Sequence, residues 1–508
     1  MLTLGEALEA SVRRRSDKVA LVFGERRWTY AEFWHRTGCW AEALARQGIR
    51  PQDRVALLLP NGLEMAEAYF GLARAGVVGV PINLRWAPPE IGYVLQHAEV
   101  QAVIADAQLA PLLAEVPGAP GRRFFTGRGA QPAWEAELAQ VAGEPEPVAV
   151  RPETPSVIVY TSGTTGRPKG AVRSHFSNLV IAMSLAAELG IHHGDVGLAL
   201  LPMFHVNSMW FVTLSLVIGA TTVIYPHRTI TPAAVVEALN RHRVTYSMFV
   251  PSLLTYLVDA AERGQLQPDS LRVMMTASAP LGPSLTARLL AAFPRLTLVD
   301  IYGATEYGAV TFMEYRQGEA SPSGSVGFPA LGQRVRILDA QHQPVPPGTI
   351  GEIWVQGPSL MTEYFQDPER TRTAFDAEGF LTVGDLGYLD AQGRLYLVDR
   401  KEDMAIVAGE NVFPAEVEEV FHSHPAVALA VVFGVPDPRR GERLVAEVVL
   451  RPGATTTPEA LRSWVAERLA DYKRPWRIHV VPELPIGPSG KVLRRLARER
   501  YLAQMAEG

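Results

Sequence analysis

The sequence predicts an α/β fold with a large N-terminal domain of mostly parallel sheets flanked by helices, a β-rich subdomain, and a small α+β C-terminal domain. Three observations support this prediction. The chain has 508 residues, which is too many for a single hydrophobic core. From about residue 52, short apolar runs alternate with amphipathic stretches, and after about residue 320 the pattern changes to strands separated by proline and glycine. We expect a large domain over residues 1–400 and a small domain over residues 401–508.

The alternation in the N-terminal part predicts two series of strands and helices. The first series has strands at 55–59, 77–82 and 100–105, with helices at 63–74 and 88–96. The second has strands at 199–201, 222–225, 246–250, 272–276 and 297–301, with helices that include 232–241 and 281–293. Repeated strand–helix–strand units predict parallel sheets with helices on both faces. Ligands of such sheets bind beyond the carboxyl ends of the strands.

The C-terminal part predicts a smaller unit that begins near residue 399. Strands at 335–338 and 351–355 precede it. A helix begins at Pro414, where proline suits the first turn. The further elements predicted are strands at 427–435 and 444–450 and helices at 458–471 and 492–503.

Composition and charge exclude several classes of protein. The net charge is -5, so nucleic acid is not an expected partner. The single cysteine, Cys39, cannot form an internal disulfide, and the start lacks a secretory signal, so we expect a cytoplasmic protein. The apolar run 209–226 is about the minimum length of a membrane span, but its glycine and hydroxyl residues favour a buried helix followed by a strand. A homodimer is left open.

Residues 160–170 form a hydroxyl- and glycine-rich loop after the apolar run 157–159. Glycines let the backbone approach phosphate oxygens, while hydroxyls and the ammonium of Lys169 supply further donors. The spacing does not match a Walker A loop, because Pro168 and Gly170 stand where that loop needs its second glycine and its final hydroxyl. The segment therefore predicts a polyphosphate site, with an ordinary turn between a strand and a helix as the alternative.

Lysine is rare in this chain. Only Lys18, Lys169, Lys401, Lys473 and Lys491 are found among 48 basic residues. Arginine is a poor substitute where a compact, strongly hydrated charge is needed. The lysines that remain are therefore enriched candidates for chemistry, above all Lys169 in the loop and Lys491 near the C-terminus.

The loop sequence YTSGTTGRPKG resembles the signature of the adenylate-forming enzymes, which include acyl-CoA synthetases, aryl-CoA ligases, luciferases and peptide-synthetase adenylation domains. The resemblance continues in family order through six segments, which are 201–205, 277–281, 302–306, 383–386, 399–401 and 490–491. It spans essentially the whole chain. It implies ATP, Mg²⁺ and the co-substrate coenzyme A as ligands, and a mobile C-terminal domain.

The resemblance also assigns roles in nucleotide binding. Thr305 would contact the α-phosphate, and Glu306 with Thr161 would bind Mg²⁺, which prefers oxygen ligands. Asp385 would accept hydrogen bonds from the ribose hydroxyls, and Tyr302 would stack on adenine. Taken alone, Glu306 is typical of a surface glutamate, Asp385 of a turn aspartate and Tyr302 of a core tyrosine. The other residues implied to bind nucleotide or coenzyme A are Thr161, Ser162, Gly163, Thr164, Thr165, Gly166, Lys169, Ala277, Ser278, Ala279, Gly303, Arg400 and Gly409.

The small domain would complete the site. By resemblance, Lys491 would bridge the substrate carboxylate and the α-phosphate during adenylation. The domain would then rotate about a hinge at Glu402, where family hinges often have Asp or Lys. Gly409 would leave room for a pantetheine arm, although it is equally typical of a plain turn.

Two positions that differ from those of particular family members suggest the class of acyl substrate. His205 stands where peptide-synthetase domains usually have an aspartate, which disfavours an amino acid. Gly303 stands where acetate enzymes have a tryptophan, which favours a longer acid. His205 is either an acyl-pocket gate or a core histidine. The predicted pocket walls, mostly apolar or neutral, are His205, Asn207, Trp210, Val250, Ser252, Ala277, Gly303 and Tyr307.

The sequence therefore predicts an ATP-dependent acyl-CoA synthetase, an acid–thiol ligase. It would activate a fatty acid of medium or long chain, or an aromatic acid, as acyl-AMP with release of pyrophosphate, and then transfer the acyl group to coenzyme A. The residues expected to take part in catalysis are Lys491, Thr305, Glu306 and His205. One alternative is a ligase with a carrier-protein or other acceptor, and a second is a non-catalytic nucleotide-binding relative.

Overall fold

The computed structural model describes residues 2–127, 129–130, 133–141, 148–161, 168–226, 230–249, 251–266, 269–277, 281, 283–318, 324–401, 403–407, 410–437, 441–487 and 492–507. The chain forms two compact units. The first comprises residues 1–323, 327–334 and 355–381, and the second comprises residues 324–326, 335–354 and 382–508. The predicted boundary at residue 400 and the hinge at Glu402, which is not among the described residues, stay predictions.

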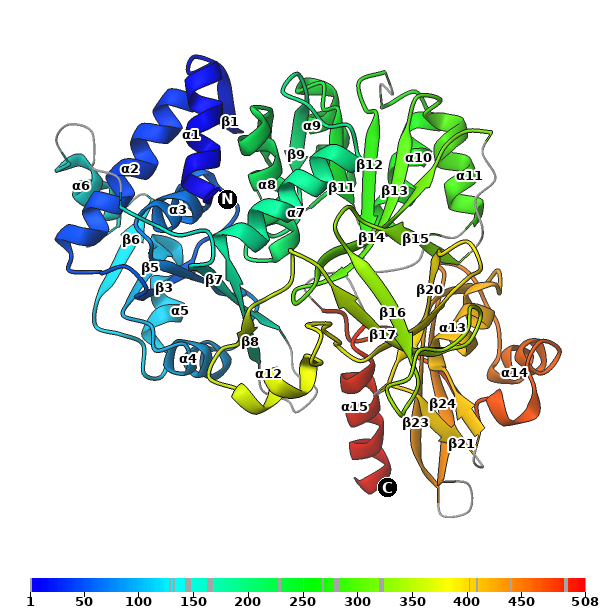
Figure 1. Cartoon of the computed structure of the whole chain (residues 1–508). Helices are drawn as coiled ribbons and strands as arrows, with labels where there is room; N and C mark the ends of the chain where they lie inside the picture. Colours follow the sequence, from blue (N-terminus) through cyan, green and yellow to red (C-terminus); the bar gives the residue numbers. More distant parts are fainter. Residues whose placement is uncertain are drawn as a thin grey trace. The chain divides into compact units, whose positions relative to one another are not determined.

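The first unit contains a seven-stranded sheet in the order β18-β8-β7-β4-β3-β5-β6 (Figure 1). Strands β7, β4, β3, β5 and β6 are parallel, and β8 and β18 are antiparallel at one edge. The bounds are β3 Arg54–Leu58, β4 Val78–Pro81, β5 Ala102–Asp106, β6 Arg123–Thr126, β7 Pro155–Thr161, β8 Lys169–Ser174 and β18 Glu363–Tyr364.

A second sheet of the first unit runs in the order β15-β14-β13-β12-β11-β9-β10-β1-β2. Its six central strands are parallel, and β14, β15 and β2 are antiparallel at the two ends. The bounds are β1 Val19–Phe23, β2 Arg26–Thr29, β9 Val196–Ala199, β10 Thr221–Ile224, β11 Tyr246–Phe249, β12 Val273–Ala277, β13 Thr297–Ala304, β14 Gly308–Tyr315 and β15 Ser325–Pro329.

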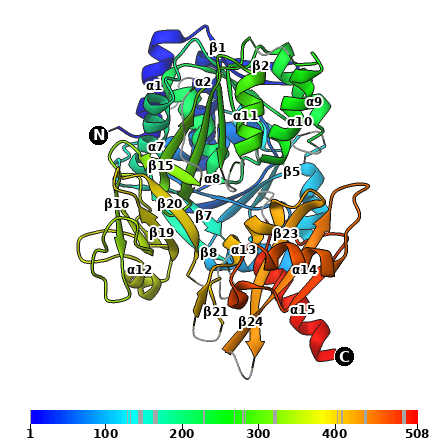
Figure 2. The same cartoon turned by 90° about the vertical axis from the view of Figure 1, so that its right-hand side faces the viewer.

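Helices cover both faces of these sheets, as Figures 1 and 2 show for α7 and α8 on one face of the second sheet and α9, α10 and α11 on the other. The alternation of strand side chains explains this arrangement. Val273 and Met275 of β12 join the core cluster that contains α7 and α8, whereas Met274 joins the cluster of α9, α10 and α11. The bounds are α1 Leu4–Arg15, α2 Tyr30–Arg46, α3 Leu63–Arg74, α4 Pro88–His97, η1 Ala107–Leu109, α5 Ala110–Ala114, α6 Trp134–Ala139, α7 His175–Glu188, α8 Val206–Ile218, α9 Pro232–Arg241, α10 Pro251–Glu262, α11 Pro283–Ala292 and α12 Pro368–Ala374.

The start of α7 is fixed by its sequence. Ser174 accepts a hydrogen bond from the Ser177 amide at 3.0 Å, and the Ser177 hydroxyl accepts one from the Ser174 amide at 3.1 Å. This reciprocal capping box satisfies amides that the first turn leaves free. It ends strand β8 and begins the helix at the next residue, at the end of the β7–β8 ladder where Ser174 pairs with Pro155, opposite the end that leads into the predicted phosphate loop.

The second unit is built from two antiparallel-rich sheets. One has the order β16-β17-β19-β20, and the other has the order β22-β21-β24-β23 with β25 parallel to β24. Its core clusters pack α13, α14 and α15 against β23, β24 and β25. The bounds are β16 Arg334–Leu338, β17 Gly351–Gln356, β19 Asp385–Leu389, β20 Leu395–Arg400, β21 Ala405–Val407, β22 Glu410–Val412, β23 Val427–Asp437, β24 Gly441–Leu450, β25 Arg477–Val480, α13 Pro414–His422, α14 Pro458–Ala466, η2 Asp471–Lys473 and α15 Arg494–Glu507.

Most predicted elements are found, and five need correction by three or more residues at one end. Two of these are the strand predicted at 444–450, which begins at Gly441, and the helix predicted at 492–503, which continues to Glu507. The strand predicted at 199–201 is Val196–Ala199, because Gly197 allows the Tyr246 ring to approach to 2.6 Å from where a Cβ would lie and so interrupts the apolar pattern. The strand predicted at 297–301 continues to Ala304, since β14 pairs with it. The helix predicted at 458–471 ends at Ala466.

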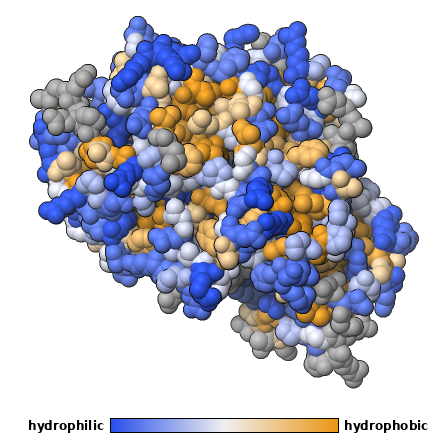
Figure 3. All heavy atoms as spheres, viewed as in Figure 1, coloured by the Kyte–Doolittle hydropathy of each residue, from blue (hydrophilic) through white to orange (hydrophobic). Residues whose placement is uncertain are grey.

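The buried helix and strand predicted for the apolar run 209–226 correspond to α8 and β10. In the described part of the chain, no helix combines the length and apolarity needed to cross a membrane. Apolar side chains also reach the surface in the region of α7 and α8 (Figure 3), where Met183 is 53% exposed.

Candidate functional site

Lys169, Glu306 and Tyr364 form one hydrogen-bonded cluster in the first unit. The Lys169 ammonium lies 2.7 Å from Glu306 Oε1 and donates to the Tyr364 hydroxyl at 2.8 Å. That hydroxyl donates to the same Glu306 oxygen at 2.9 Å. Lys169 begins β8, Glu306 lies in the turn between β13 and β14, and Tyr364 belongs to β18, which pairs with β8. Two residues predicted from distant segments are thus in direct contact.

The cluster keeps a buried carboxylate ionised. Glu306 is 4% exposed, and burial alone would raise its pKa. The charge of Lys169 and the hydrogen bonds from Lys169 and Tyr364 outweigh burial and hold the pKa of Glu306 below its usual value. Burial, with the adjacent Glu306 charge, raises the pKa of Tyr364, so the phenol stays a donor. The carboxylate is therefore available to a cation at neutral pH.

The donor set fits Mg²⁺ that is bound together with a triphosphate. Mg²⁺ is usually held by one or two carboxylates plus substrate phosphates, and the described residues contain no group of three or more His, Cys, Asp or Glu that could hold a metal alone. Thr161 pairs with Lys169 in the β7–β8 ladder. Its hydroxyl is buried and has no hydrogen-bond partner among the described residues. A buried hydroxyl of this kind favours a ligand that completes its hydrogen bonds.

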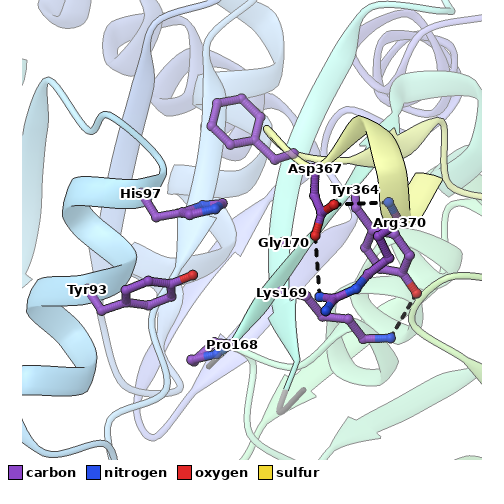
Figure 4. A pocket seen from close by; sticks show the side chains of 9 residues that line it. Tyr93, His97, Pro168, Lys169, Gly170, Tyr364, Asp367 and Arg370 are labelled. Atoms are coloured by element: carbon purple, nitrogen blue, oxygen red, sulfur yellow. Dashed lines mark hydrogen bonds and ion pairs between the residues drawn. The ribbon is translucent and has the colours of Figure 1, made fainter. Parts of the chain in front are cut away.

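A pocket of about 170 Å³ lies beside Lys169. Figure 4 shows Tyr93 and His97 of α4 facing Lys169, Tyr364, Asp367 and Arg370. Asp367 and Arg370 lie 3.6 Å apart as an ion pair. The His97 ring and the Tyr160 hydroxyl share a hydrogen bond of 2.7 Å. The remaining lining residues are Pro168, Gly170 and Phe365.

The turn that carries Thr305 and Glu306 closes a hairpin between β13 and β14. The ladder shifts register between Tyr302 and Gly303, which is a bulge that redirects the chain. A Cβ on Gly303 would lie 2.2 Å from the Gly308 carbonyl oxygen. This close approach requires glycine, a reason that the acyl-pocket prediction for Gly303 did not include.

The predicted adenine and acyl residues of the first unit lie around this hairpin and α8. The Tyr302 and Tyr307 rings meet edge to face with centroids 6.4 Å apart, and Ala277 pairs with Ile301 beside them. His205 precedes α8 and its ring packs against Phe204 at 4.6 Å. Asn207 and Trp210 follow in the helix, where Trp210 is 5% exposed.

Trp210 and Tyr307 are both buried, and their predicted roles as acyl-pocket walls stay predictions. The predicted roles of Tyr302, Ala277, His205 and Asn207 stay predictions.

Asp385 and Arg400 belong to the second unit and contact each other. They face each other across the β19–β20 ladder, and Arg400 Nε lies 3.2 Å from Asp385 Oδ1. The Asp385 side chain is 12% exposed. An acceptor of this kind, already paired with a guanidinium, suits the predicted contact with ribose hydroxyls, which stays a prediction.

Arg494 connects the segment after Lys491 with the segment around the predicted hinge. Its guanidinium pairs with Asp399 at 3.2 Å, with Asp403 at 2.5 Å and with Glu418 at 3.0 Å. One half-buried cation therefore joins α15, β20 and α13 within the second unit.

Several predicted residues are outside the described residues. Their roles stay predictions, and they are Ser162, Gly163, Thr164, Thr165, Gly166, Ser278, Ala279, Val250, Glu402, Gly409 and Lys491, together with the side chain of Ser252.

Two residues of the site were missed from the sequence. Tyr364 belongs to a strand of two residues and carries no readable signal. Arg173 follows the apolar residues of β8 and is completely buried. A charge inside a buried strand is rare unless it is paired, so its position could have been noticed.

Comparison with known proteins places this geometry in a family. Residues 8–365 match the sequence profile described as AMP-binding enzyme, and residues 416–491 match that of the AMP-binding enzyme C-terminal domain. The chain belongs to the AMP-binding enzyme family. The predicted adenylate-forming superfamily and the α/β fold class are therefore confirmed.

Similar proteins cover nearly the whole chain. A fatty acid–acyl-carrier-protein ligase of Streptomyces coeruleorubidus is 34% identical over 94% of this chain and 92% of its own length. A feruloyl-CoA synthase of an Amycolatopsis species is 34% identical over 93% of this chain and 94% of its own length. The structure of an O-succinylbenzoate coenzyme A synthetase from Bacillus subtilis, in complex with ATP and a magnesium ion, matches with a TM-score of 0.86 at 29% identity, covering 97% of this chain and 99% of that chain.

Proposed function

We propose that the protein is an ATP- and Mg²⁺-dependent acyl-CoA synthetase for a monocarboxylic fatty or aromatic acid. The observation that carries the proposal is the cluster of Lys169, Glu306 and Tyr364 beside the Thr161 hydroxyl. It supplies a cation, an ionised carboxylate and a hydroxyl that no described residue hydrogen-bonds, at the end of the predicted phosphate loop. Together these groups suit a metal-bound triphosphate.

In the first half-reaction, a carboxylate oxygen of the acid would attack the α-phosphorus of ATP, and the bond to the bridging oxygen would break to release pyrophosphate. Lys169 would move from Glu306 to the outer phosphates. Glu306 would hold Mg²⁺, which neutralises part of the triphosphate charge when bound. Thr305 and Lys491 would hold the α-phosphate and the acid in line.

In the second half-reaction, the thiolate of coenzyme A would attack the acyl carbonyl, and the bond to AMP would break. The small domain would rotate about Glu402 between the two steps, with Gly409 beside the pantetheine arm. Asp385 would hold the ribose through both steps. These residue roles rest on the family resemblance and on the contacts described above.

The acid class rests on the pocket residues and on the relatives. The burial of Trp210 and Tyr307, two of the predicted pocket walls, supports a pocket for an apolar acid, and relatives carry the names of a fatty acid ligase and a feruloyl-CoA synthase. A carrier protein is the second candidate acceptor, because the fatty acid relative is named as an acyl-carrier-protein ligase. A cytoplasmic location and a homodimer stay predictions.

The test measures acid-dependent exchange of labelled pyrophosphate into ATP with a panel of acids from propionate to palmitate, plus benzoate and ferulate. We expect exchange with a subset of these acids and Mg²⁺, and AMP release that rises on addition of coenzyme A. Lys491→Ala and Glu306→Gln serve as inactive controls. Exchange without a product that depends on coenzyme A, but with acylation of a phosphopantetheinylated carrier protein, would replace the first acceptor with the second. No exchange with any acid would reject the function.

A further inference from the structure

Arg173 contacts the backbone of Thr305, a residue of the predicted nucleotide site, and has no role in the chemistry described so far. It is completely buried in β8. Its Nη1 donates to the Thr305 carbonyl at 2.8 Å, and its Nη2 donates to the Ser359 carbonyl at 2.5 Å. Its Nε donates to Asn178 Oδ1 at 2.9 Å. Three segments that are distant in sequence are thus joined by one guanidinium.

The cost of burying this charge indicates a function. The described residues contain no carboxylate in an ion pair with Arg173, and the acceptors are neutral oxygens. Burial lowers the pKa of Arg173 to about 9, while the nearby Glu306 charge acts in the opposite direction, so the group stays charged at neutral pH. A buried charge of this kind is expensive, and apolar residues of similar volume often serve packing as well or better.

The bonded carbonyl of Thr305 belongs to the turn that carries the two predicted catalytic groups. The same turn is held from its other side, where the Glu306 carbonyl accepts from the Met361 amide at 2.7 Å. The fork of Arg173 is rigid and planar, so it fixes the height and direction of the Thr305 peptide. Without it, one side of the turn would lose its anchor.

The network also reaches the predicted acyl wall. The Trp210 indole donates to the same Asn178 oxygen at 2.9 Å, and the guanidinium of Arg173 lies 5.0 Å from the centre of the Trp210 ring. Asn178 donates in turn to Ser156 at 3.0 Å. Arg173 thus contacts both the Thr305 turn and Trp210, a predicted residue of the acyl pocket.

We propose that Arg173 is a positioning residue for adenylation, which holds the Thr305–Glu306 turn against the phosphate strand and links it to Trp210. This inference rests on the proposed function, because it assumes that Thr305 contacts the α-phosphate. Arg173 itself does not touch the reacting atoms. It acts through Thr305.

The experiment compares Arg173→Lys and Arg173→Met with wild type in pyrophosphate exchange, and measures ATP affinity separately by titration calorimetry. A misplacement of about 1 Å can cost roughly 100-fold in rate, so we expect kcat to fall about 10-fold in Arg173→Lys and about 100-fold in Arg173→Met. The charge that lysine keeps accounts for the partial rescue. ATP affinity should fall roughly threefold to tenfold in Arg173→Met, because the α-phosphate contact loosens.

A matched control is Arg74, which makes the same kinds of contact away from the site. It donates to the Trp34 carbonyl at 2.5 Å and to the Thr37 hydroxyl at 2.8 Å, and it lies over the Trp34 ring. Arg74→Lys and Arg74→Met should lower the melting temperature and leave kcat and ATP affinity within about twofold of wild type. Because Arg74 is half-buried, this control separates loss of a hydrogen-bonded guanidinium from loss of turn position.

A double-mutant cycle tests whether Arg173 acts through Thr305. In a Thr305→Ala background, Arg173→Lys should lower kcat by less than about threefold, since the side chain that it positions is gone. Equal losses in both backgrounds would overturn the proposal. If the Arg173 variants do not fold, Asn178→Ala removes the acceptor shared by Arg173 Nε and the Trp210 indole and leaves the two carbonyl contacts of Arg173 in place, and an unchanged kcat in that variant would also overturn it.

The role of Arg173 can still be tested if the proposed function is rejected. Wild-type protein without exchange on any acid rejects the function, and Arg173 is then judged by ATP affinity alone. Unchanged ATP affinity in Arg173→Met with a folded protein would overturn the positioning role, and a selective loss relative to Arg74→Met would support it.

Discussion

His175, the first residue of α7, should make the stability of the protein depend on pH. The side chain is completely buried, and neither ring nitrogen has a hydrogen-bond partner in the described part of the chain. Burial lowers the pKa of His175 from 6.5 to about 4, although the charge of Glu6 acts in the opposite direction. The imidazole is therefore neutral in the folded protein at any pH at which the enzyme would work.

The size of the effect follows from linkage. Below pH 6.5 the unfolded chain binds a proton at His175, and the folded chain does so only below about pH 4. The contribution of neutral His175 to the free energy of unfolding is therefore fully present above about pH 6.5 and is lost as the pH falls toward 4. A pKa lowered from 6.5 to about 4 corresponds to about 3.4 kcal/mol in full. Between pH 7 and pH 5 the expected loss is about 2 kcal/mol.

The assay is urea unfolding of wild type and His175→Leu at several pH values between 7 and 5. Other titrating groups contribute equally to both proteins, so the difference between them isolates His175. We expect the wild type to lose about 2 kcal/mol more than the variant over this range. At pH 7 the variant should be at least as stable, because the unpartnered ring nitrogens are removed from the core.

His35→Gln on α2 is the control, since His35 is exposed and its replacement should leave the pH dependence of wild type intact. Parallel stability curves for wild type and His175→Leu would refute the reasoning. They would mean that the ring is solvated or paired in the folded protein.

Three further predictions concern the site. Tyr364→Phe removes the hydroxyl that donates to Glu306 at 2.9 Å, which should raise the pKa of that carboxyl and move the acid limb of the exchange rate to higher pH. Gly303→Ala places a Cβ 2.2 Å from the Gly308 oxygen, which should cost about 1–3 kcal/mol of stability and slow pyrophosphate exchange. Asp385→Asn should raise the KM for ATP about tenfold with a smaller change in kcat, measured by steady-state kinetics.

Each of these predictions has a result that contradicts it. An unshifted acid limb in Tyr364→Phe would show that its hydroxyl does not tune Glu306. Gly121→Ala is the control for Gly303→Ala, because a Cβ there meets no atom within 4 Å, and equal effects of the two changes would contradict the hairpin argument. An unchanged KM in Asp385→Asn would remove the ribose role.

The fold could be predicted from the sequence where the apolar residues are clearly periodic and where a residue such as proline marks the start of a helix. Helix α9 begins at Pro232 and ends at Arg241 as predicted, because proline marks its first turn and apolar residues recur at helical spacing. Strand β9 was misplaced because Gly197 has no side chain to register in the apolar pattern. The packing partner that requires this glycine, Tyr246, lies elsewhere in the chain and is not visible to a local pattern.

Only some residues of the candidate site could be predicted from the sequence. Lys169 and Glu306 were predicted through motifs, but their direct contact depends on how two sheets bring β8 and the β13–β14 turn together. Tyr364 was missed because a two-residue strand has no periodicity. The partners of Arg173 could not be predicted for a different reason. Two of them are backbone carbonyls, which every residue has, so the residue type does not show which carbonyls accept.

The charges of the cluster explain why nucleotide and metal should bind together. Lys169 and Arg173 carry two positive charges around the single negative charge of Glu306, and Glu306 already accepts two hydrogen bonds. A divalent cation alone would meet this excess of positive charge with one carboxylate to hold it. Under the proposed function, a triphosphate would reverse the balance, because it would draw Lys169 away from Glu306 and bring its own oxygens to the metal. Binding would therefore exchange the Lys169–Glu306 ion pair for two contacts with the substrate.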